Sequence, residues 1–158
     1  MDRNTTDIQS HIHDGLMSQL INFTDIFGYT EPINVISQTI GTAAGNYDAY
    51  FLAPRSLRVF QVDFSAVDAL AANNTNYITW TLTNLGQAGA GTGALLGTNN
   101  TTVTNGSAIA ANTKRTFVLT TALNDLNVIQ GDRIRIRAAV TGTLANSVTF
   151  PVYLIQSQ

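Results

Sequence analysis

Three arginines alternate with isoleucines near the C-terminal end of the sequence, at Arg133, Arg135 and Arg137. The chain has only 8 lysines and arginines, so a large share of its basic side chains lies in this one segment. Successive side chains of a strand point to opposite faces, which buries Ile134 and Ile136 and puts the arginines on the other face. A guanidinium binds a carboxylate in two places, so we predict a stripe that contacts carboxylates of another chain. The alternative is a solvated face, or an edge strand whose charges discourage stray pairing.

The two histidines, His11 and His13, are separated by Ile12 and followed by Asp14 and Gly15. In an extended segment both imidazoles face one side, but two nitrogens alone make a weak metal site. Three copies in a homotrimer would supply six, enough for an octahedral ion on the axis. We expect instead that both are polar residues of an arm, with no metal and no cofactor bound.

No set of catalytic residues is visible, and we expect a protein that is not an enzyme. The absence of cysteine excludes thiolate nucleophiles, disulfides and thiolate metal sites. Asp63 and Asp68 are close in sequence, so paired carboxylates stay open. The glycines of residues 86–97 lack the spacing and the lysine of a phosphate-binding loop, and a small-molecule ligand is not expected.

The chain is poor in charge. Charged residues make up 11% of it, less than half the usual share, and none occurs from Ala69 through Thr113. A formal net charge of -2 gives no field that would attract a polyanion, so we do not expect nucleic acid as a partner. No stretch is long and apolar enough to span a bilayer, and the first residues lack the layout of a signal peptide. We therefore expect a protein made in a cytoplasm, with no membrane partner.

Apolar residues recur at every second position from Ile33 onward, which predicts strands. The segment 76–85 is the clearest, with Ile78, Trp80 and Leu82 on one face. The segment 57–67 carries apolar residues on both faces, so its core side stays open. Predicted strands cover residues 33–40, 47–53, 57–67, 76–85, 114–121, 133–140 and 147–155, with a hairpin turn at Asn105–Gly106. Seven or eight such strands predict an all-β fold, an antiparallel β-sandwich or jelly roll over residues 32–158.

Residues 1–31 have scattered apolar side chains without a clean period. We predict an extended N-terminal arm that becomes ordered against a partner, with contacts from Ile12, His13, Leu16 and Leu20. The alternative is a frayed terminus.

Four segments resemble a class of bacteriophage virion proteins that pair an N-terminal arm with a small β-sandwich. The recurring pattern is a strand that begins at an Asn-rich turn, a Gly/Ala loop, and a strand that follows a Gly-Asp pair. The matching positions are Asn74 to Thr81, Gln87 to Thr92, Asn112 to Leu119 and Gln130 to Val140, which with the segments between them make up less than half of the chain. The His-x-His-Asp-Gly element is similar to one in phage fibre and decoration proteins.

The resemblance implies a decoration, or cement, protein of a tailed-phage capsid. Such a protein would bind the outside of the virion, contact the major capsid protein and clamp neighbouring subunits. We expect a homotrimer, with Arg133, Arg135 and Arg137 at a subunit or capsid interface. The alternatives are a tail-fibre or receptor-binding module, although the long repeats of a fibre shaft are absent, and a secreted carbohydrate-binding module.

Overall fold

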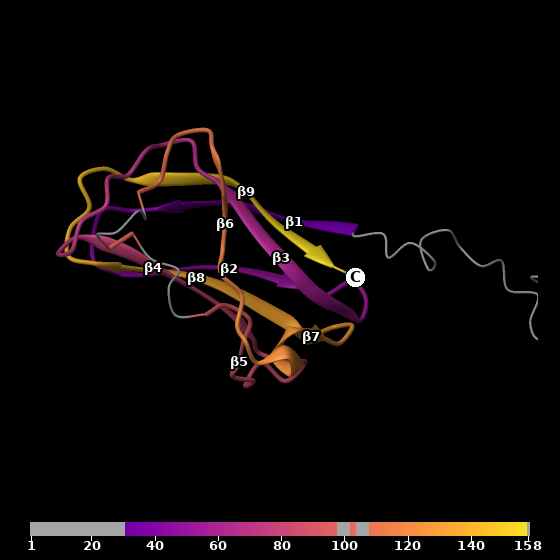
Figure 1. The fold of residues 1–158 in the computed structure, drawn as a ribbon. Coiled ribbons are helices and arrows are strands. Elements are labelled where there is room, and N and C mark those ends of the chain that lie inside the picture. Colours follow the sequence, from indigo (N-terminus) through magenta and orange to yellow (C-terminus); the bar gives the residue numbers. More distant parts are fainter. Residues whose placement is uncertain (1–30, 98–101, 104–107, 158) are drawn as a thin grey trace, which may run out of the picture. The chain divides into compact units, whose positions relative to one another are not determined.

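The computed structural model describes residues 31–97, 102–103 and 108–157. These residues form two antiparallel sheets packed face to face, as Figure 1 shows, which confirms the predicted all-β sandwich. The predicted arm lies almost wholly outside the described residues. So do His11, Ile12, His13, Leu16 and Leu20, and the predicted hairpin turn at Asn105–Gly106.

The first sheet, sheet A, has the spatial order β1 (Glu31–Ile40), β9 (Val148–Ser157), β3 (Leu57–Ser65) and β6 (Lys114–Thr116), and β7 (Asn127–Val128) also pairs with β3. The second sheet, sheet B, has the order β2 (Gly45–Leu52), β8 (Arg133–Thr141), β4 (Tyr77–Asn84) and β5 (Gly93–Ala94). A 3₁₀ turn, η1 (Leu123–Leu126), precedes β7. If the short β7 is set aside, these two orders are those of a jelly roll, in which most successive strands cross from one sheet to the other.

The ladder at residues 114–121 is shorter than predicted. Only Lys114–Thr116 pairs with β3. Leu119 then makes a single bridge to Leu96, which follows β5 in the chain. The N–H of Phe117 still donates to the carbonyl of Val62 in β3, whereas the carbonyl of Val118 already accepts from the N–H of Gly97. Side chains keep alternating between buried and exposed through this change of partner, since Phe117 is buried and Val118 is exposed. Residues 114–121 therefore pair first with sheet A and then with the segment around Leu96. The alternation of side chains is the same in both parts, so the sequence predicted one continuous strand.

The core between the sheets is organised around Phe64 of β3. Its ring centroid lies 4.6 Å from that of Phe117, 5.2 Å from Phe150 and 5.3 Å from Trp80. Such distances are those of favourable tilted and offset aromatic pairs. Trp80 is only 1% exposed, as its strand pattern predicted, and Ile134 and Ile136 are buried as well.

A β-bulge resolves the ambiguous pattern of residues 57–67. The register of β3 against β9 shifts between Val59 and Gln61, so Phe60 is an extra residue in the ladder. Before the bulge Leu57 and Val59 are buried; after it the buried apolar side chains are Val62 and Phe64. The bulge therefore moves the apolar face from odd to even positions, which is why both faces looked apolar in the sequence.

Strand β8 lies between β2 and β4, hydrogen-bonded on both sides. The alternative that its arginines protect a sheet edge is therefore wrong. Buried and more exposed side chains alternate along the strand from Arg133 to Thr141, as predicted. The position of β8 in the sheet could not be read from this alternation, because centre and edge strands share it.

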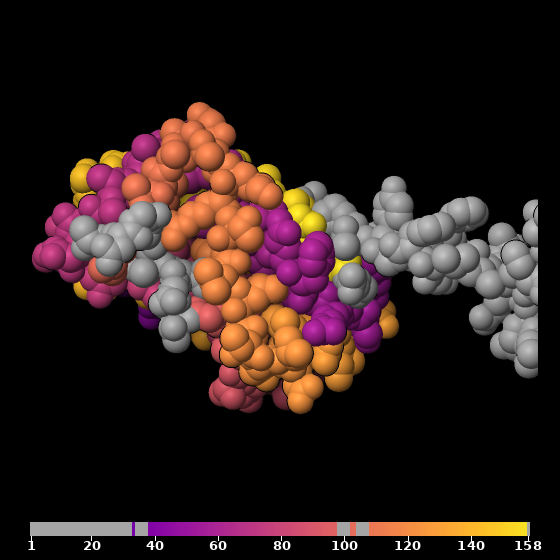
Figure 2. All heavy atoms as spheres, in the orientation of Figure 1, coloured from indigo at the N-terminus to yellow at the C-terminus, as the bar shows by residue number. Residues whose placement is uncertain are grey.

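The side of the sandwich beyond β5 and β6 is covered by the chain itself. Residues 108–130, orange in Figure 2, cross this side of the molecule. Arg115 of β6 adds to the cover, with its guanidinium carbon 5.8 Å from the ring centroids of both Phe64 and Trp80. Burial lowers the pKa of Arg115, and cation–π contact compensates for part of its lost hydration.

Replacing Phe64 by alanine should destabilise the fold by about 3–5 kcal/mol, because it leaves a cavity at the centre of the aromatic cluster. The matched control is Phe60→Ala on the same strand, since Phe60 is 41% exposed and should cost well under half as much. Urea denaturation of both variants measures the difference. Equal losses at the two positions would contradict this account of the core.

Candidate functional site

The three arginines of β8 lie on the outer face of sheet B, the face turned away from sheet A. Their cross-strand neighbours are Leu52 for Arg133, Tyr50 and Thr83 for Arg135, and Asp48 and Thr81 for Arg137. The structure thus keeps the predicted residues on one face, but gives each a different environment.

Arg137 is held by Asp48 of β2 in a two-pronged ion pair. Its Nε lies 2.7 Å from Oδ1, and its Nη2 donates to Oδ2 at 2.8 Å. The hydrogen bond from Arg137 is the main cause that lowers the pKa of Asp48, against the opposing effect of burial. The carboxylate in turn raises the pKa of Arg137. The charge of Arg137 is therefore balanced within the fold, and two of its three guanidinium nitrogens already donate to Asp48.

Arg133 lies over the ring of Tyr50, with its guanidinium carbon 4.3 Å from the ring centroid. The hydroxyl of Tyr50 donates to Oδ2 of Asp48 at 3.2 Å. Tyr50 is 45% exposed and Leu52 is 66% exposed, so an aromatic, an aliphatic and a cationic group reach solvent side by side. Tyrosine and arginine are enriched among the residues that dominate binding energy in protein interfaces.

Arg135 lies between these two pairs. Its Nε is buried and has no hydrogen-bond partner among the described residues. Its charge helps to lower the pKa of Asp48, but that carboxylate already binds Arg137 in two places. Arg135 consequently has a buried donor that is available to a partner.

The outer face of sheet B carries an excess of positive charge. Strands β2, β8 and β4 present three guanidiniums and one carboxylate on it, which leaves two positive charges uncompensated on the face. Neither Arg133 nor Arg135 has a carboxylate within ion-pair distance in the described part of the chain. A face of this kind, on a rigid sheet, can bind an anionic protein surface.

Sequence reasoning found the three arginines but missed their partners on β2. Asp48 is the only charged residue between Glu31 and Arg55, a weak signal that could have singled it out. The pairing itself depends on β2 and β8 being neighbours in sheet B, which no local pattern reveals.

Asp63 and Asp68 are each engaged by their own structural partners. Asp63, 2% exposed, accepts hydrogen bonds from Thr116, from Gln61 at 2.8 Å and from Gln156 at 3.2 Å, and its Oδ2 lies 3.4 Å from the Lys114 ammonium. Burial would raise the pKa of Asp63, but these hydrogen bonds outweigh it and the pKa is lowered. Asp68 accepts from the main-chain N–H of Thr149 at 3.0 Å.

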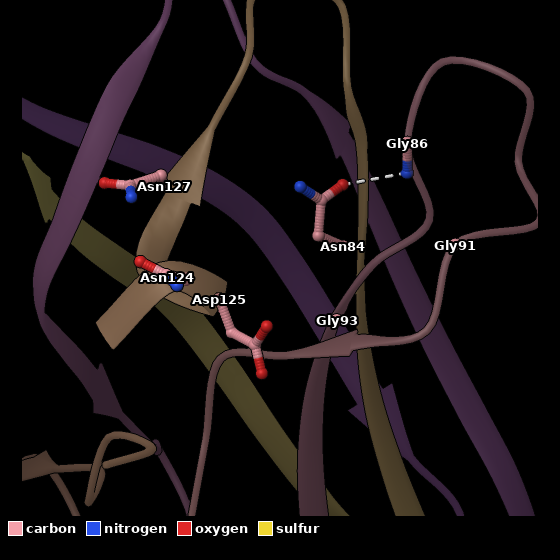
Figure 3. A pocket seen from close by; sticks show the side chains of 7 residues that line it. All are labelled: Asn84, Gly86, Gly91, Gly93, Asn124, Asp125 and Asn127. Atoms are coloured by element: carbon pink, nitrogen blue, oxygen red, sulfur yellow. Dashed lines mark hydrogen bonds between the residues drawn. The ribbon is translucent and has the colours of Figure 1, made fainter. Parts of the chain in front are cut away.

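A second polar feature is a hollow of about 230 Å³ beside β4, shown in Figure 3. It is lined by Asn84, Gly86, Gly91, Gly93, Asn124, Asp125 and Asn127. Asn84 is already used, since it accepts from the N–H of Gly86 and donates to Asp132, both at 2.8 Å. A Cβ on Gly91 would lie 2.7 Å from the main chain of Asn84, so this glycine lets the loop fold back on itself. The glycines of residues 86–97 therefore shape a tight loop.

The described residues contain no group of three or more His, Asp or Glu side chains that could hold a metal ion. The one helical element in this part of the chain, η1, is four residues long and cannot cross a membrane. Comparisons with protein families, with curated proteins and with solved structures give no match. The outer face of sheet B is thus the candidate site on the strength of its own chemistry.

Replacing Asp48 by asparagine should cost about 1 kcal/mol at neutral pH, because Arg137 loses its charged partner. A carboxyl whose pKa is lowered on folding stabilises the fold above its unfolded pKa, and this contribution disappears as the pH falls through the lower, folded value. The difference between wild type and variant should therefore shrink toward pH 2. Denaturation at pH 7 and pH 2 measures it, with Asp125→Asn as the control that removes a charge outside this ion pair. A difference that grows on acidification would contradict the assignment.

Proposed function

We propose that this protein is a structural virion protein that binds the outside of a phage capsid and stabilises the shell by bridging neighbouring capsid subunits. The observation that carries the proposal is the outer face of sheet B, where Arg133 and Arg135 stand free of carboxylate partners in the described part of the chain. The partner is the major capsid protein, recognised through carboxylates on its outer surface.

The chemistry of this face favours a protein over a small molecule. Tyr50, Leu52 and Arg133 border an open hollow and not an enclosed cavity, and Arg135 and Arg137 lie farther along β8. Exposed arginines speed association and fix the register of a contact, while the apolar neighbours exclude water from it. The exposed charges also make such binding sensitive to salt.

The architecture supports the same proposal by analogy. Jelly rolls are common in viral capsid and lectin domains, and a fold alone does not determine a function. Between a capsid protein and a lectin, we choose the virion protein because four segments of the sequence resemble phage virion proteins. The predicted arm over residues 1–31 and the predicted homotrimer remain predictions, as does the capsid-surface location.

The alternative is a tail-fibre or receptor-binding module. A sugar-binding version needs exposed aromatic rings for stacking, and the single tryptophan of the chain, Trp80, is buried in the core. This observation counts against glycan recognition through tryptophan. A glycan array and a host-cell binding assay would separate the two functions, because a decoration protein should give no signal in either.

The protein should co-sediment with undecorated phage heads and raise the temperature at which they rupture. Arg135→Gln should weaken head binding about tenfold or more, because a charged hydrogen bond across an interface is lost. The control is Arg58→Gln, which removes an exposed arginine of β3 in sheet A. Binding should also weaken from 50 to 300 mM salt.

Wild-type protein that neither sediments with heads nor protects them would reject the proposal. Equal weakening by Arg135→Gln and Arg58→Gln would reject the outer face of sheet B as the contact. Circular dichroism and a denaturation curve for each variant separate a lost contact from a lost fold.

A further inference from the structure

The two sides of the sandwich end in very different edge strands. On one side β5 and β6 have two and three residues, and residues 93–95 together with Thr102 bond to the edge of β4. There the N–H of Leu95 donates to the carbonyl of Leu82, and the N–H of Thr102 donates to that of Ile78. On the other side β2 has eight residues and pairs only with β8 among the described residues. Short or covered edges are protected from further pairing, and long bare ones are not.

The main-chain groups that β2 leaves free can be identified. The N–H and carbonyl of Arg133 bond to Gly86 and Leu85 beyond β4, so the even-numbered residues of β8 point their groups toward β2. In the observed register these bond to Gly45, Tyr47, Ala49 and Phe51. The N–H and carbonyl groups of the even-numbered residues of β2 therefore face away from the sheet; these residues are Asn46, Asp48, Tyr50 and Leu52.

Strand β2 also lacks the devices that usually keep an edge from pairing. It contains no proline, no lysine and no bulge, and its single charge, Asp48, is neutralised by Arg137. Along its end runs a hollow of about 520 Å³ lined by Tyr50, Phe51, Leu52 and Arg133. Phe51, on the core face, stays half-buried because no strand lies beyond it among the described residues. The edge is thus open along its length and apolar at its Leu52 end.

We propose that β2 is the contact through which two copies of this chain associate, edge to edge and antiparallel. The two copies of sheet B would then form one continuous eight-stranded sheet across a two-fold axis. In a two-fold contact, each residue pair occurs twice, once in each direction between the two copies. The strand must therefore be complementary to itself. This proposal does not depend on the proposed capsid binding, because it concerns only how the chain contacts a second copy of itself. It competes with the predicted homotrimer, and a mass of three chains would favour the trimer instead.

The strand is complementary to itself in one register, with Ala49 on the axis. This register opposes Asn46 to Leu52 and Asp48 to Tyr50 of the other copy, and it uses all four outward residues of each strand. Each opposed pair exchanges two main-chain hydrogen bonds, so four pairs give eight. The two Asp48 carboxylates stay apart, each opposite a tyrosine hydroxyl. A second copy therefore matches the charge and the hydrogen-bonding pattern of this edge along its whole length.

The test uses two charged variants of the full chain. Asn46→Lys with Leu52→Lys places lysine opposite lysine at both ends of the contact, and Asn46→Glu with Leu52→Glu does the same with glutamate. Both positions are exposed, so the fold of the single chain should be unaffected. Each variant alone should have a dimer dissociation constant at least about tenfold higher than wild type, since like charges opposed across strands repel. A mixture of the two should dimerise again, because each lysine then faces a glutamate.

Sedimentation equilibrium measures the outcome against the chain mass of 16.9 kDa. The proposal expects twice this mass for wild type, and the control Ala88→Lys with Ala90→Lys, which adds the same charge in an exposed loop, should not change it. Wild-type monomers at all concentrations, or an assembly of another number of copies that ignores the β2 charges, would overturn it. Variants that separate but fail to recombine on mixing would overturn the register.

A single cysteine gives an independent readout of the axis. In this register Ala49 opposes itself at a non-hydrogen-bonded position, where the two Cα atoms lie about 4.5 Å apart. That separation allows a disulfide, and the native chain has no cysteine to compete. Ala49→Cys should form a covalent dimer under mild oxidation, whereas Ala88→Cys should not. Equal cross-linking at both positions would overturn the placement of Ala49 on the axis.

Discussion

The packing of one aromatic ring against both sheets holds this molecule together. Phe64 lies on β3 of sheet A and contacts Trp80 of sheet B, Phe150 of β9 and Phe117 of the segment that closes the open side. Because these four side chains come from distant parts of the sequence, their contact fixes the spacing of the two layers. The bulge at Phe60 matters for the same reason, since it turns Phe64 into the core and Asp63 out of it.

The outer chemistry follows from this inner packing. With Ile134 and Ile136 held against the core, the arginines of β8 must stand on the opposite face, in the middle of sheet B. There the neighbouring strand β2 determines the contacts of each arginine. Asp48 forms an ion pair with Arg137, and the ring of Tyr50 packs against the guanidinium of Arg133. The Nε of Arg135 has no hydrogen-bond partner among the described residues. A row of equal residues in the sequence thus becomes three different chemical environments.

Much of the fold could be predicted from the alternation of side chains alone. Residues 76–85 and 133–140 have one apolar face and one polar face. Both segments form strands, β4 and β8, and the apolar face of each is buried. Two kinds of feature were out of reach. A bulge changes the parity of a strand without leaving a mark in residue type, so the core side of residues 57–65 stayed open. Partners across strands, such as Asp48 with Arg137, depend on which strands are neighbours, and a jelly roll makes neighbours of segments far apart in the chain.

The placement of β9 has a consequence for how the chain folds. This strand lies between β1 and β3 and pairs with both, so Glu31 meets Ser157 across the ladder. Until residues 148–157 have been synthesised, β1 and β3 have nothing to join them within sheet A. Contacts between residues so distant in sequence close large loops, and folds dominated by them form slowly. The half of the sandwich made of sheet A therefore cannot be completed while the chain is still being translated through β8.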